Sequence, residues 1–275
     1  MSGDEVFVSF VSVILALVGI GVSSTAGLHR LYFRGNPAPG VVRLGVFGAM
    51  AWIVFVLGFY ADPSITGIYV LFYLVMGYAV VKCFGQGGAA LLGFRTRVDA
   101  GERRNSAAAI LIAVFTLATG LIFGGSLWGE ADPVGEDEGG WWIPVTFFLL
   151  GWLTLVMAFV LYQRRDGRLA RRVRRERRPK DARAAAAFLL AAAASLTDAV
   201  AGDFWGWRHG IFSFGLLAVL LLVHESFAAW KLPDDPAEAT RSADPRRVIE
   251  SMAYLALAAI AWTASRYVDT TWGPG

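Results

Sequence analysis

The sequence contains little of what most catalytic and metal-binding sites require. Its 275 residues include a single cysteine, Cys83, which excludes an internal disulfide and any cysteine-rich metal site. Only three histidines are present, and the zinc-protease, nucleophile-elbow and phosphate-loop signatures are all absent. Charged residues make up 17% of the chain, against about 25% in an ordinary soluble domain. We therefore expect no cofactor and no metal, and the composition disfavours an enzyme.

Apolar residues make up 56% of the chain, above the roughly 45–50% of soluble proteins, and they gather in long runs. About 20 such residues fill the hydrocarbon core of a bilayer, where a helix satisfies its own backbone. The sequence therefore predicts an all-α polytopic membrane protein, folded as a single helical bundle over residues 1–275. The expected spans are 6–28, 42–60, 66–84, 106–128, 142–162, 184–201, 210–230 and 248–266.

The loops between these spans alternate in charge. Four of them (29–43, 82–105, 163–183 and 231–247) hold all but two of the 25 Lys and Arg. Loops rich in Lys and Arg stay on the cytoplasmic side of a membrane. The pattern predicts a multi-pass protein of the cytoplasmic membrane, with about eight spans and with both the N-terminus and the C-terminus outside.

The loop at 163–183 concentrates most of the positive charge. It holds eleven Lys and Arg and three Asp and Glu. We interpret it as a solvated loop that contacts anionic lipid headgroups, and we expect no nucleic acid partner. A membrane protein partner or a homo-oligomer is also compatible with such a loop.

The spans differ in the size of their side chains. Span 184–201 is mostly alanine, which gains little from lipid, so we place it inside the bundle. Span 142–162 is bulky and is expected to face lipid. Gly120 and Gly124 form a GxxxG pair that could pack closely on another helix. The even-numbered spans end in similar Gly/Asp/Trp clusters, as four hairpin units or two parallel four-span halves would produce.

Ionisable residues inside a membrane cost a few (~2.5–3.5) kcal/mol on insertion scales and are often functional. One group of polar residues lies at the small, hydroxyl-rich end of the first span and at the outer ends of the sixth and eighth. As a substrate or ion path it would consist of Ser23, Ser24, Thr25, Thr197, Asp198 and Arg266. Asp198 could alternatively form a structural ion pair with Arg266, and the small residues that end the first span could alternatively form a close helix-packing seam.

A second group lies at the inner ends of the spans. It would form a gate or proton relay, or else anchor the helices at the interface, and it consists of His29, Lys82, His224 and Glu225. His224 and Glu225 are adjacent, so they point about 100° apart on a helix and cannot both face one site directly.

Three classes of function fit these observations. The favoured one is a permease-like protein that moves an ion or a small solute across the cytoplasmic membrane. The alternative is a non-catalytic subunit or assembly factor of a larger membrane complex. The third is a membrane-embedded enzyme that modifies a lipid.

Overall fold

The computed structural model describes residues 3–23, 35–62, 65–129, 140–201, 207–229 and 236–271, where all regular structure is helical. Within these ranges, the structure describes the backbone but not the side chains of residues 22, 166, 207–211, 236–244 and 264–271. The long helices are α1 (Gly3–Ser23), α3 (Ala38–Phe59), α4 (Ile68–Val80), α6 (Ser106–Ser126), α7 (Trp142–Asp166), α9 (Pro179–Ala199), α10 (Trp207–Ala229) and α11 (Pro236–Thr271). The short ones are α5 (Gly88–Leu91), α8 (Leu169–Arg174) and two π-helices, η2 (Val81–Gly87) and η3 (Thr96–Glu102).

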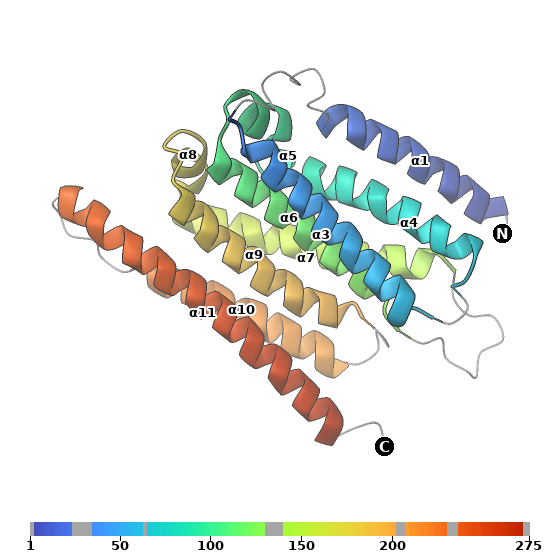
Figure 1. The fold of residues 1–275 in the computed structure, drawn as a ribbon. Coiled ribbons are helices and arrows are strands. Elements are labelled where there is room, and N and C mark those ends of the chain that lie inside the picture. The colour runs from blue at the N-terminus through green and yellow to red at the C-terminus, as the bar shows by residue number, and fades with distance from the viewer. Residues whose placement is uncertain are drawn as a thin grey trace.

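Seven helical segments of the described chain are long and apolar enough to cross a membrane. They coincide with the first seven predicted spans, which confirms an all-α polytopic membrane protein. Helix α11 covers the predicted eighth span at 248–266 but is not among the seven. Helix α1 begins and α11 ends at the same end of the bundle (Figure 1), as an even number of crossings requires. Which side of the membrane this end faces stays a prediction.

Three predicted spans were clearly shorter than the helices that contain them. The third span was expected to end at residue 84, but α4 continues through η2 and α5 to Leu91. The sixth was expected to begin at residue 184, but α9 begins at Pro179, with Asp181 in its first turn. Proline and acidic residues both favour the first turn of a helix, so α9 begins within the charged stretch that precedes its apolar run. The eighth was expected to begin at residue 248, but α11 begins at Pro236, within the stretch expected to be a loop.

The most extensive helix contacts join α3 to α6, α6 to α9, and α9 to α11. These four helices form a row, against which α4, α7 and α10 pack, whereas α1 packs on α4 and η2 (Figure 1). The long helices of the first half are α1, α3, α4 and α6, and those of the second half are α7, α9, α10 and α11. Within each half the second helix makes its largest contact with the fourth (α3 with α6, α9 with α11), and the first packs on the third (α1 on α4, α7 on α10). The two halves therefore share a packing order, as two parallel four-span repeats would.

Small residues allow the central helices to approach closely. A Cβ atom added at Gly120 of α6 would lie 2.4 Å from the Ala49 Cβ of α3, and one at Gly124 would lie 2.4 Å from the Trp52 Nε1. The predicted GxxxG contact face is thus a real one. The alanine-rich α9 is largely buried, as predicted, but α6 is more deeply buried still.

The end of the bundle opposite to the start of α1 carries residues 92–105, α8 and the start of α9 (Figure 1). We call it the arginine-rich end. The loop around α8 had been expected to be solvated throughout, and this was wrong in part. Arg172 and Arg174 pair with buried carboxylates, whereas most of the other arginines there are exposed.

Candidate functional site

A buried group of polar side chains joins three of the helices near the arginine-rich end. It consists of His224 from α10, Glu250 and Tyr254 from α11, and Tyr162 from α7, each at most 1% exposed. We call these four residues the His224 cluster. Residues 250 and 254 are one helical turn apart, so α11 presents both side chains on the same face.

Three atoms of the cluster lie within hydrogen-bonding distance of one another. The Nδ1 of His224 is 3.0 Å from the Oε1 of Glu250 and 3.1 Å from the Tyr254 hydroxyl. The Tyr254 hydroxyl donates to the same Glu250 oxygen over 2.8 Å, and the Tyr162 hydroxyl does so over 3.4 Å. The Tyr162 ring also stacks on the imidazole, with 3.8 Å between centroids. The ring of His224 is therefore held in one orientation.

The negative charge of the cluster is compensated by arginines on its side nearest the arginine-rich end. Arg247, one turn before Glu250 on α11, donates from Nη1 to Glu250 Oε2 over 2.6 Å and from Nε to Asp181 Oδ1 over 2.9 Å. Arg172 of α8 donates from Nε to the same Asp181 oxygen over 3.0 Å. Two carboxylates thus face two guanidinium groups, which offsets the cost of burying these charges.

One position of the cluster is left without a partner. Among the described residues, the Nε2 of His224 is buried and has no hydrogen-bond partner. Imidazole is the side chain whose charge changes between about pH 5 and 8. Nδ1 lies beside Glu250, whereas an N–H at Nε2 would be buried without an acceptor, so the ring carries its proton best on the side of the carboxylate. The cluster therefore brings a ring that can carry a proton and a carboxylate together inside the bundle.

A third buried carboxylate lies in the other half of the chain. Asp99 of η3 is fully buried and accepts hydrogen bonds from the Arg95 backbone N–H over 2.8 Å, from Arg103 Nη1 over 3.3 Å and from Arg174 Nε over 3.2 Å. Arg174 belongs to α8, as Arg172 does. Helix α8 is therefore held between Asp99 on one side and Asp181 on the other.

Asn105 adds a further connection to α8. It begins α6 as the N-cap, accepting from the Ala108 N–H over 3.1 Å, and its amide donates to the Val173 carbonyl over 2.8 Å. Asn105 is fully buried, so both ends of its amide are used. The contact of the exposed arginines of this loop with anionic lipid headgroups stays a prediction.

The members of the proposed gate lie in separate places. His224 is buried, whereas the adjacent Glu225 is 42% exposed and pairs with Arg165 of α7 at 2.5 Å. The two do not share a site, as their spacing predicted. Lys82 lies in η2, where its Nζ donates to Gln86 Oε1 over 2.8 Å. His29 falls outside the described residues.

The proposed path at the end of the first span is only partly described. Ser24 and Thr25 fall outside the described residues. Ser23 is buried in α1, and its hydroxyl donates to the Gly19 carbonyl over 2.6 Å. A Cβ atom at Gly19 would lie 2.6 Å from the Lys82 Cβ, so this part of the span forms a close contact with η2.

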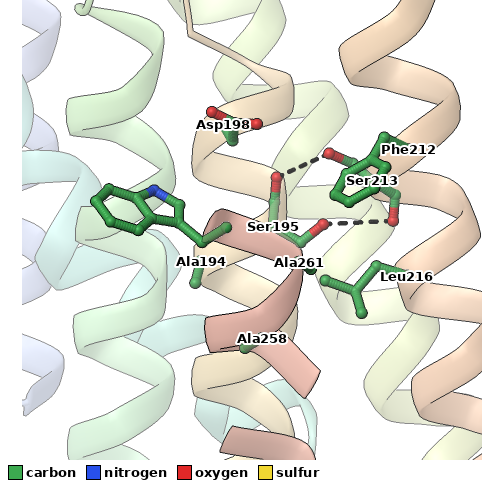
Figure 2. A pocket seen from close by; sticks show the side chains of 9 residues that line it. Ala194, Ser195, Asp198, Phe212, Ser213, Leu216, Ala258 and Ala261 are labelled. Carbon is green, nitrogen blue, oxygen red and sulfur yellow. Dashed lines mark hydrogen bonds between the residues drawn. The ribbon is translucent and has the colours of Figure 1, made fainter. Parts of the chain in front are cut away.

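Asp198 lines a small pocket between α9, α10 and α11 (Figure 2). No residue of the His224 cluster is among those that line this pocket. Ser195 and Ser213 also line it and exchange hydrogen bonds with each other's carbonyl groups, over 3.3 and 3.0 Å. The Thr197 hydroxyl donates within α9 to the Ala193 carbonyl, away from any shared site. Arg266 lies on α11, but its side chain is outside the described part, so its pairing with Asp198 is untested.

Several residues of the His224 cluster and its ion pairs were not predicted. Glu250, Arg247 and Asp181 were counted as parts of loops or span ends, because each stands beside a charged stretch. A signal was present, since Arg247, Glu250 and Tyr254 are spaced by three and four residues, which places them on one helix face. Tyr162 carried no such signal.

In the described part of the chain, no three His, Cys, Asp or Glu side chains gather as a metal site would require. Comparison with known proteins gives no match: no family model, no curated protein and no solved structure is similar to this chain. The structure supports an integral membrane protein on its own, through seven helical segments able to cross a membrane.

Proposed function

We propose that this chain is a permease of the cytoplasmic membrane that moves protons, either alone or together with a small solute. The observation that carries the proposal is the His224 cluster, in which an imidazole and a carboxylate share hydrogen bonds while fully buried in a helical membrane bundle. Ionisable groups at such a position are expensive and mark ion or proton pathways in membrane proteins.

The route would run between α9, α10 and α11. The pocket beside Asp198 lies between these helices, and the cluster takes His224 and Glu250 from two of the same helices. Ser213 and His224 are separated along α10 by roughly 16 Å, at 1.5 Å per residue. The buried residues of α10 in this interval are leucines, including Leu217 and Leu220. Protons would cross this apolar stretch only when helices move apart or water enters.

The direct test is proton movement by the purified full-length chain in liposomes that contain a pH-sensitive dye. A potassium gradient with valinomycin sets the membrane potential. We expect faster internal acidification than in protein-free liposomes. Glu250→Gln and His224→Gln should each reduce the rate at least tenfold, because neither variant can hold the proton that the pair shares.

Glu225→Gln is the matched control. It removes a carboxylate that is adjacent to His224 in sequence but pairs with Arg165 outside the cluster and is 42% exposed. We expect it to keep the rate of the unmodified chain. If the unmodified chain moves protons no faster than protein-free liposomes, or if Glu250→Gln moves them at the full rate, the proposal is wrong.

The alternative of a non-catalytic subunit is favoured by a different observation, the exposed arginines on and beside α8, such as Arg168, Arg171 and Arg175. These could dock on an acidic partner. Native mass spectrometry after gentle extraction separates the two functions. A stoichiometric complex together with no proton movement would favour the subunit.

A further inference from the structure

We infer that Lys82 and Gln86, on the π-helical turn of the third span, bind the anionic group of a phosphate-class ligand. The group could belong to a lipid headgroup or to a soluble phosphate. The inference does not rest on the proposed proton movement, because η2 lies in the first half of the chain and the His224 cluster in the second.

Charge compensation is the first observation. Three half-buried arginines of the bundle have carboxylate partners: Arg172 and Arg247 pair with Asp181, and Arg174 pairs with Asp99. Lys82 differs, because in the part of the chain that the structure describes no carboxylate lies within ion-pair distance of its ammonium group. An ammonium group in a membrane span calls for a counter-charge, and the described residues supply none.

The depth of Lys82 is the second observation. Its predicted place was the inner end of the span, where a lysine can extend to water cheaply. The helix instead continues for nine more residues to Leu91, so Lys82 lies more than two turns inside the span. Its side chain is partly buried, and its one hydrogen bond goes to Gln86, which is itself 5% exposed.

The local geometry leaves donors for a ligand. An ammonium group has three N–H donors, and Gln86 Oε1 accepts from one of them. Helix α1 packs against the stem of the lysine at Gly19, and the Cys83 thiol donates to the Leu15 carbonyl over 3.0 Å. The stem is therefore held in place, while the remaining N–H donors can meet an anion. π-Helical turns of this kind occur frequently at functional sites.

The test uses the full-length protein, purified and delipidated in a neutral detergent, and follows its thermal unfolding. Phosphatidylglycerol, phosphatidylcholine and inorganic phosphate are titrated separately. We expect phosphatidylglycerol or inorganic phosphate to raise the melting temperature and phosphatidylcholine not to. A response to phosphatidylglycerol alone identifies a lipid headgroup, and a response to inorganic phosphate identifies a soluble anion.

The variants assign the response to a residue. Lys82→Met should weaken the apparent affinity at least tenfold, whereas Lys82→Arg, which keeps the charge, should retain most of the response even if Lys82→Met folds poorly. Arg97→Gln, which removes an exposed cation of η3 that pairs with Glu102, should respond as the unmodified chain does. No response of the unmodified chain to either anion, or equal responses of Lys82→Met and the unmodified chain, would overturn the inference.

Discussion

The close contact between α3 and α6 allows the loss of stability caused by one substitution, Gly45→Ala, to be predicted. A Cβ atom added at Gly45 of α3 would lie 2.3 Å from the carbonyl oxygen of Ala113 and 2.7 Å from its Cα. Both are backbone atoms of α6, which no rotamer change can move. Gly45→Ala therefore requires the two helices to separate by roughly 1 Å, a gap that forfeits up to about half of each dispersion contact at that point.

The expected cost is the difference between two terms. Overpacking of a tight core costs about 1–3 kcal/mol, and the upper end applies here because backbone opposes the new methyl group. Alanine is a better helix former than glycine, and this offsets up to about 1 kcal/mol of the overpacking cost. We expect Gly45→Ala to destabilise the protein by about 2 kcal/mol.

Gly58→Ala is the matched control within the same helix. Nothing lies within 4 Å of a Cβ atom at Gly58, so this substitution should be neutral or stabilise the protein by up to about 1 kcal/mol. The two variants can be compared by unfolding in dodecyl sulfate, followed by tryptophan fluorescence. Equal midpoints for Gly45→Ala and Gly58→Ala would refute the close approach of α3 and α6.

Three further predictions concern the arginine-rich end, and the same unfolding assay measures them. Asn105→Ala should destabilise by about 2 kcal/mol, because a helix cap and the hydrogen bond to Val173 are lost together; an unchanged midpoint would contradict the buried amide geometry. Glu225→Gln should change stability by less than about 0.5 kcal/mol, because its pair with Arg165 is exposed; a large loss would show hidden contacts. Gly167→Ala should cost about 1 kcal/mol, since this residue ends α7 with φ at +58°, and a gain in stability would argue against that turn.

The arrangement of spans was largely predictable because hydropathy and charge are local properties that add along a segment. Burial was less predictable, because it depends on neighbours that are distant in sequence. The alanine content of α9 indicated a central helix, and α9 is central. Helix α6 contains both bulky residues and glycines, so its composition indicates no particular position. It is nevertheless the most buried of the seven spans, because it contacts both α3 and α9.

Of the four residues of the His224 cluster, only His224 was predicted from the sequence as a site residue. His224 was predicted because it is an ionisable residue at the inner end of a span. Glu250 lies inside the predicted span 248–266 but was not predicted as a site residue, because its partner is an imidazole 26 positions away in the sequence. The π-helical geometry of η2 also has no clear signature in the residues themselves, so Lys82 was placed too near the end of its helix.

The close packing of α6 on α9 limits how this protein can change shape. A Cβ atom at Gly125 would lie 2.6 Å from the carbonyl oxygen of Thr197, so the two halves of the chain meet with almost no side chain between them. An alternating cycle in which one half swings away from the other would have to break this contact. Helices α1, α7 and α10 are far less buried than α6 and α9, so if the chain is a permease, opening and closing would fall to these outlying helices while α6 and α9 stay packed together.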